Sequence, residues 1–230
     1  FIAWSQDAAV QQQLALMDGL SDTHPLRGFH AGNRDSLPVP QPEFQQALQD
    51  FYQRYYQTGQ MTLSLAGPQS LDELRLLAEA FGNVIANGEK VPQQAPTPLM
   101  AGASNSYQQV GEHRLDLLFA LEALPDSSAE ALGFLCHWLN TAKSGGLLAE
   151  LRKQGRVENL KARPLYQFAG QALLHIEFTL PANALASEIG EQLRDWLSFF
   201  AQQDWRGLRE EYAALRQRQT SSALQLARQD

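Results

Sequence analysis

The chain has 230 residues, of which 44% are hydrophobic and 19% charged, and its formal net charge is −7. This length and balance are typical of one large domain or two modest ones with a buried core, and they exclude a chain that is disordered throughout. The acidic charge, without a basic stripe, disfavours nucleic acid as the main partner, and no apolar run reaches the roughly 18 residues that a membrane-spanning helix needs.

The chain begins at Phe1 with FIAWSQDAAV, which has neither the basic region nor the apolar core of a signal peptide. It enters helix-like sequence at once, with no capping residue ahead of it, as we expect of a fragment or a processed product. Cys136 is the only cysteine in the sequence, which excludes an intramolecular disulfide and is compatible with a reducing compartment. We therefore expect a cytoplasmic location.

Apolar residues recur at helical spacing in two segments near the N-terminus. Residues 1–20 predict a helix that ends near Gly19. Residues 43–56 predict a second helix with a wide apolar stripe, and Pro42 stands where the first helical turn tolerates proline.

The following segment changes from a period of two to a helical period. Residues 61–65, MTLSL, alternate apolar and polar side chains and predict a half-buried strand. Ser70 and Glu73 have the spacing of a capping box, which predicts a helix from there to about Val84. Residues 41–85 therefore predict helix, strand and helix in that order.

Residues 86–106 are rich in proline, glycine, alanine and polar side chains, as is typical of a linker. We place a domain boundary there, so that residues 1–94 and 95–230 form separate domains. Periodicity beyond the boundary predicts strands at 107–110, 115–121, 157–163 and 168–180, and helices at 127–139, 146–154, 182–204 and 206–228. Strands mostly precede runs of helices, which favours an α+β fold.

The stretch HPLRGFHAGNRDSL, residues 24–37, leaves open a metal site, an anion-binding loop or a structural turn. His24 and His30 are six residues apart, whereas zinc ligands on one helix face lie at i and i+4, and the chain has no H-x-x-E-H or H-E-x-x-H motif. No strand leads into Gly28 and Gly32, so they do not match a phosphate loop. We expect a structural loop.

The other histidines and the cysteine offer no catalytic set. His137 lies within an apolar helix, where we expect it to pack. His113 precedes a strand and His175 lies on the polar side of one, and we expect both to be solvated. Cys136 has no recognisable partner for a thiolate mechanism, and no G-x-S-x-G nucleophile elbow occurs. We assign no catalytic residue and no metal ligand in this chain.

The segment SGGLLAELRKQGRVENLKARP, residues 144–164, contains the remaining candidate site. Gly145 and Gly146 precede a short helix and would let a ligand backbone approach closely. The strand after Gly155 would offer an edge to which a peptide adds as a further strand. An ordinary turn, helix and covered strand explain the same spacing, and spacing alone favours that interpretation.

Three segments carry a family resemblance in their order: HPLRGFHAGN, QALQDFYQRYYQTGQMTLSLAGPQSLDELRLLAEAFG and SGGLLAELRKQGRVENLKARP. Together they resemble the pitrilysin and insulin-degrading enzyme family of zinc peptidases, which have an inverted H-x-x-E-H motif. The resemblance spans nearly the whole chain. It implies α+β, pitrilysin-type domains, with an antiparallel-rich mixed sheet and helices packed on one face.

The resemblance implies that residues 1–94 are the last part of a first domain and residues 95–230 most of a second. The H-x-x-E-H motif and the third zinc ligand would lie upstream, so zinc belongs to the intact protein and this chain is expected to bind none. The intact protein would be a zinc endopeptidase that processes a small peptide, and this piece alone would be inactive. Its partners would be the missing N-terminal and C-terminal parts and a peptide substrate, with neither nucleic acid nor a membrane.

The family's second domain has an exosite that takes the N-terminal segment of a substrate as an added strand. By position, the resemblance implies substrate contacts at Gly145, Gly146, Leu147, Leu160, Lys161 and Ala162. Two other functions stay open. The chain would be a non-catalytic subunit that assembles through the helical face of residues 182–228, or a plain α+β binding domain with no peptide role.

Overall fold

The structure is a computed structural model that describes residues 2–28, 31–100, 113–182 and 184–226. Contacts divide the chain into two compact units, residues 1–4 with 29–96 and residues 5–28 with 97–230, and helix α1 (Ile2–Gln6) spans the division. The domain boundary between residues 94 and 95 stays a prediction, since these units follow contacts and not chain order. Within the described ranges, we find no helix whose length and hydropathy would let it cross a bilayer.

The first unit contains α3 (Pro42–Tyr55) and α4 (Leu71–Gly82), which confirms both predicted helices. The capping box is present: the Glu73 N–H donates to Ser70 Oγ over 3.3 Å, and the Ser70 N–H donates to the Glu73 carboxylate over 2.8 Å. The hydrogen bonds that the Ser70 N–H and the Ser70 hydroxyl donate to the carboxylate lower the pKa of Glu73, because they favour its charged form. The hydrogen bonds to the Glu73 carboxylate therefore stabilise α4 fully at pH values above the unfolded pKa of this carboxyl. That contribution is lost as the pH falls through the lower folded pKa.

The strand predicted at residues 61–65 is wrong for this chain. Residues 61–66 form neither helix nor strand, and Met61, Leu63 and Leu65 are 42%, 45% and 42% exposed. Alternation marks a strand only where a neighbouring strand supplies hydrogen bonds and a core covers one face. The described part of the first unit supplies neither to this segment.

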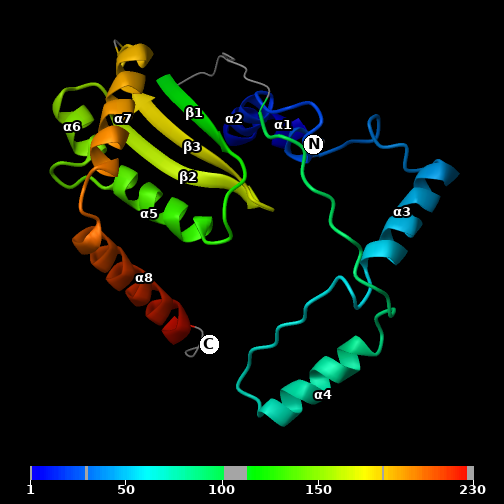
Figure 1. Cartoon of the computed structure of the whole chain (residues 1–230). Coiled ribbons are helices and arrows are strands. Elements are labelled where there is room, and N and C mark those ends of the chain that lie inside the picture. The colour runs from blue at the N-terminus through cyan, green and yellow to red at the C-terminus, as the bar shows by residue number, and fades with distance from the viewer. Residues whose placement is uncertain (1, 29–30, 101–112, 183, 227–230) are drawn as a thin grey trace. The chain divides into compact units, whose positions relative to one another are not determined.

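The second unit contains a three-stranded antiparallel sheet in the order β1-β3-β2. Its strands are β1 (His113–Leu121), β2 (Asn159–Phe168) and β3 (Gln171–Leu180), as Figure 1 shows. Ala169 and Gly170 join β2 to β3 with φ of 48° and 80°. Two successive positive φ values are typical of the hairpin turn whose twist matches the strands. The predicted α+β class is confirmed, and the predicted segment 107–110 lies outside the described residues.

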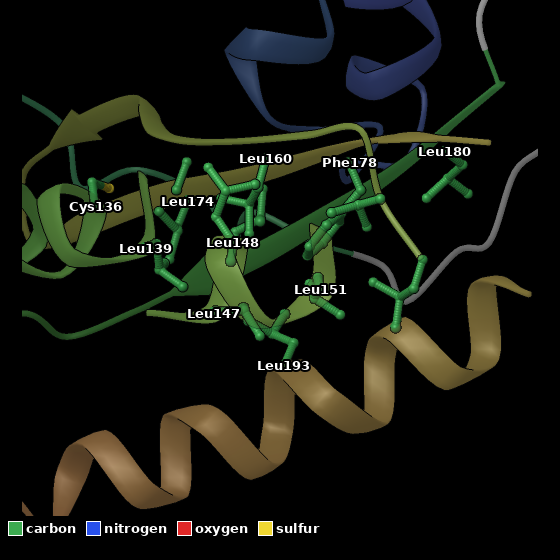
Figure 2. Close-up of a cluster of buried hydrophobic side chains, with 14 residues drawn as sticks. Cys136, Leu139, Leu147, Leu148, Leu151, Leu160, Leu174, Phe178, Leu180 and Leu193 are labelled. Carbon is green, nitrogen blue, oxygen red and sulfur yellow. The ribbon is translucent and has the colours of Figure 1, made fainter. Parts of the chain in front are cut away.

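Side chains of β3 alternate between the sheet's faces, and four of them enter the main hydrophobic core: Leu174, Ile176, Phe178 and Leu180. Helices α5 (Ser128–Asn140), α6 (Leu147–Lys153) and α7 (Ala186–Ala201) cover this face (Figure 1). Figure 2 shows the helical members of the core against those of the sheet, among them Cys136, Leu139, Leu147, Leu148, Leu151, Leu160, Leu174, Phe178, Leu180 and Leu193. Ser127, the residue before α5, makes no side-chain capping hydrogen bond.

The opposite face of the sheet contacts α2 (Ala8–Met17). Leu16, Met17 and Leu20 pack there on Leu173 of β3 and form a smaller hydrophobic cluster. The single helix predicted over residues 1–20 is therefore two helices, α1 and α2, and the break lies at Asp7, which caps α2 through its carboxylate. The last helix, α8 (Arg206–Leu226), follows α7 in the same unit.

The structural interpretation of the HPLRGFHAGN stretch is confirmed at His24. This side chain is buried, its Nδ1 accepts the Leu26 N–H over 3.1 Å, and its Nε2 lies 3.3 Å from Gln171 Oε1. Both ring nitrogens are therefore used to hold the turn against β3. His30 lies outside the described residues.

Burial makes Cys136 a poor nucleophile. Desolvation raises the pKa of its thiol to about 11, so almost none is thiolate at neutral pH. We expect iodoacetamide to label Cys136 slowly in the folded chain at pH 7.5, and much faster once urea unfolds it. Mass spectrometry of timed samples would measure both rates, and equal rates would contradict the burial.

Candidate peptide-binding site

The six residues implied by the resemblance lie on two neighbouring segments of the second unit. Leu160, Lys161 and Ala162 belong to β2, which is an edge strand among the described strands. Gly145 and Gly146 lie in the α5–α6 connection, and Leu147 is the first residue of α6. The edge position of β2 is the property that strand addition requires.

The two glycines form a tight turn ahead of α6. Gly145 has a φ of +84°, a conformation that favours glycine. A Cβ on Gly146 would lie 3.0 Å from the carbonyl oxygens of Thr141 and Lys143, so a side chain there would crowd the turn. The conformation of the turn explains both glycines without a ligand.

Three of the six side chains are directed into the protein. Leu147, Leu160 and Ala162 are buried members of the main core. Figure 2 shows Leu147 and Leu160 with Leu174 and Phe178 of β3. All three are unavailable to a ligand as side chains. A peptide at this edge would therefore contact main-chain groups of β2, and the neighbouring side chains would act by positioning them.

A side chain that we did not predict, Asn140 at the end of α5, occupies part of this edge. Its Oδ1 accepts the Ala162 N–H over 2.6 Å, and its Nδ2 donates to the Ala162 carbonyl over 2.8 Å. Asn140 thus makes the pair of hydrogen bonds that an added strand would make at Ala162. A peptide that pairs with Ala162 must displace it.

Because the main-chain N–H and C=O of Ala162 point to the outer edge, the directions of the same groups in neighbouring residues are also known. Main-chain groups of successive strand residues point to opposite edges, so those of Leu160 and Pro164 share the outward direction of Ala162. Pro164 has no N–H to donate. Arg152 Nε donates to the Glu158 carbonyl over 2.9 Å just before the strand. Before the bulge at Pro164–Tyr166, Leu160 is therefore an outward position of β2 whose main-chain groups these side chains do not contact.

Lys161 lies on the other face of the sheet, where it is exposed and pairs in register with Glu177 of β3. Its ammonium group is near the edge without being buried. It would lie beside a peptide that runs along β2, and it would favour an acidic one.

The same face holds a buried polar network next to Glu177. His175 is 0% exposed, and its Nε2 lies 2.7 Å from Asp116 Oδ1 of β1. Gln12 of α2 donates from its Nε2 to Asp116 over 3.2 Å and to Glu177 over 2.8 Å. Our prediction of a solvated His175 is wrong, because α2 covers this face of the sheet.

Asp116, His175 and Glu177 are also the one group of three possible metal ligands found among the described residues, with ligand atoms within 4.8 Å of one another. The group does not fit the zinc site that the resemblance implies. Its oxygens already accept hydrogen bonds from the Gln12 amide, whose nitrogen lies between the two carboxylates. The ligands also come from two strands, whereas the family motif supplies its histidines from one helix.

Sequence patterns had limited power to identify these contacts. The alternation of β1 and β3 places Asp116, His175 and Glu177 on one face, so it could have revealed that polar cluster. Asn140 and Ala162 are 22 residues apart in the chain. No local pattern reports a contact at that separation.

Comparison with known proteins identifies the family. Residues 44–211 match the family model described as the peptidase M16 inactive domain. Coenzyme PQQ synthesis protein F of Pseudomonas protegens is 56% identical over 235 residues, which cover 100% of this chain and 28% of that protein. The protein of the same name from Pseudomonas syringae pv. tomato is 55% identical, over 99% of this chain and 29% of its own length. The chain thus spans less than a third of these relatives.

Two solved structures share the fold. Pitrilysin superposes with a TM-score of 0.70 at 19% identity, over 89% of this chain and 23% of pitrilysin. A peptidase M16 inactive domain from Pseudomonas fluorescens superposes with a TM-score of 0.69 at 17% identity, over 100% of this chain and 56% of that one. These likenesses agree with the α+β architecture described above. The chain belongs to the peptidase M16 family, and its residues 44–211 correspond to the inactive domain of that family.

Proposed function

We propose that this chain is the chamber-wall and exosite portion of a zinc endopeptidase that processes a small peptide, the PqqA precursor, in the synthesis of pyrroloquinoline quinone. The proposal is supported by identities of 56% and 55% to relatives named coenzyme PQQ synthesis protein F. Zinc and its ligands would come from the parts of such a protein that this chain lacks. The observation that carries the binding role is the edge position of β2.

The binding step would be strand addition at β2. The Leu160 main-chain groups would form the first pair of hydrogen bonds with the peptide, and Asn140 would then leave Ala162 to the incoming strand. Gly145 and Gly146 would let the peptide backbone pass close to the start of α6, and Leu147 would hold that helix in the core. Lys161 would attract acidic side chains of the peptide.

Two substitutions at Leu160 test this edge. Leu160→Pro removes the outward N–H together with core packing, whereas Leu160→Ala removes packing and keeps the N–H. We expect Leu160→Pro to weaken binding of a synthetic PqqA peptide by about tenfold relative to Leu160→Ala, since a main-chain hydrogen bond and its strand geometry are lost. Titration calorimetry measures both, and equal affinities would reject the edge as the site.

Asn140→Ala tests the competition for Ala162. The folded chain would lose two partly buried hydrogen bonds, worth about 1–2 kcal/mol of unfolding free energy in total. The same change would free the edge, so we expect tighter binding of the PqqA peptide. Asn83→Ala, which removes an amide from the end of α4, is the matched control and should change neither quantity. Weaker peptide binding in Asn140→Ala would mean that Asn140 holds the peptide and does not compete with it.

A non-catalytic scaffold subunit is the second candidate, and exposed apolar side chains in the first unit favour it. Phe51 of α3 and Leu71 of α4 are 54% and 85% exposed, a surface suited to a protein partner. We expect the purified chain to show no zinc-dependent peptidase activity alone. Co-expression with the N-terminal part of the same protein, which would carry H-x-x-E-H, should restore chelator-sensitive hydrolysis of PqqA. A complex that forms and stays inactive would favour the scaffold.

A further inference from the structure

A cavity of about 620 Å³ lies among α5, α7 and α8, within the second unit. Its size is within the range of small-molecule sites, which are about 300–1,000 Å³. Its walls are mainly apolar, and four aromatic rings contribute to them: Phe134, Phe200, Trp205 and Tyr212. The cavity shares none of its lining with the β2 edge, so a binding role for it is independent of the proposed function.

The aromatic walls are held in place by contacts with one another. The Phe134 ring centroid lies 5.9 Å from that of Phe200, 6.2 Å from that of Trp205 and 5.6 Å from that of Tyr212. The Trp205 Nε1–H donates to the Phe200 carbonyl over 2.7 Å, which fixes the indole. A ring that enters this cavity would meet prearranged aromatic partners at little cost in side-chain entropy.

The rim of the cavity carries both signs of charge. The Arg209 guanidinium carbon lies 5.7 Å from the centre of the Trp205 ring, and Arg209 makes no ion pair with any residue whose side chain the structure describes. A guanidinium that stacks on an indole keeps its N–H groups directed outward and suited to a carboxylate. Glu130, in the first turn of α5, also lines the cavity. Its charge disfavours ligands with several negative groups.

We propose that this cavity is a binding site for a small aromatic carboxylate. The ring would pack against Phe134 and Trp205, and the carboxylate would accept hydrogen bonds from Arg209 at the rim. A ligand with one negative charge suits the site, because Arg209 can pair with that charge and Glu130 would repel a second one. The apolar walls supply affinity, and Arg209 supplies the selectivity for an acid over a neutral compound of the same shape.

Titration calorimetry of the 230-residue chain with 3-phenylpropionate tests the site, with 3-phenyl-1-propanol as the neutral ligand of matching shape. We expect saturable binding of the acid and about tenfold weaker binding of the alcohol, because a hydrogen bond to a charged group is lost. Arg209→Gln should weaken binding of the acid by a similar factor and leave binding of the alcohol unchanged. Arg218→Gln, on the same helix but outside the cavity lining, is the control and should change neither.

Two further variants locate the ligand. Glu130→Gln should strengthen binding of the acid about twofold to threefold, as expected for the removal of an exposed like charge. Trp205→Leu should weaken binding of both the acid and the alcohol. Circular dichroism would verify that this variant folds. Absence of saturable binding, equal binding of acid and alcohol, or an Arg209→Gln variant that binds the acid like the parent chain would each overturn the proposal.

Discussion

Replacement of Phe178 by alanine is expected to lower the free energy of unfolding of the second unit by about 3–5 kcal/mol, the range for large aromatic side chains removed from cores. Phe178 is 0% exposed and lies on the central strand, in register with Leu115 of β1 and Leu160 of β2. Helices α6 and α7 close the other side of the same core (Figure 2). These neighbours come from several different elements and cannot collapse together into the space that the ring leaves.

Urea unfolding followed by far-UV circular dichroism measures this loss. Phe168→Ala is the matched control, because Phe168 ends β2 and is 44% exposed. We expect the control to lose much less unfolding free energy than the core variant. The slope of unfolding free energy against urea concentration should be similar in both. A Phe178→Ala chain as stable as the control would mean that the sheet does not pack on α6 and α7 as described.

The second large effect is expected from Asp116→Ala, at the centre of the buried polar network. The change removes the acceptor that lies 2.7 Å from His175 Nε2 and one of the two acceptors of the Gln12 amide. A buried polar group left without its partner costs about 1–3 kcal/mol, so we expect a loss in this range. Part of this loss should depend on the contact between Asp116 and His175.

A double-mutant cycle separates that pair from general disruption. The cycle combines Asp116→Ala with His175→Ala and measures unfolding free energies in urea. We expect the double variant to lose clearly less than the sum of the single variants, since each single change already breaks the shared hydrogen bond. Asp195→Ala, an exposed carboxylate on α7, is the control and should be nearly neutral. Strict additivity would contradict the contact between Asp116 and His175.

The edge of β2 connects the fold to the proposed binding role. Unpaired strand edges tend to aggregate, and proteins commonly cover them. Here Asn140 covers Ala162, Arg152 covers the Glu158 carbonyl, and Pro164 lacks a donor. An edge protected by displaceable side chains resists pairing with other copies until a peptide competes for it, and this explains how one strand would serve both stability and recognition.

Local patterns in the sequence predicted much of the secondary structure. The periodicity of residues 43–56 and the Ser70–Glu73 box identified α3 and α4, and alternation identified β1 and β3. The physical reason is that helix periodicity, caps and strand alternation depend on residues a few positions apart. The order of weak motifs likewise indicated the peptidase family.

The sequence by itself thus determined most of the helices, the capping box of α4, the α+β class and the family. Only the tertiary structure decided that residues 61–65 lack a strand partner, that α2 buries His175, and that Asn140 occupies the edge at Ala162. Each of these depends on which segments meet in space. Burial and hydrogen-bond pairing are properties of such contacts between distant segments, and no short stretch of sequence contains both partners.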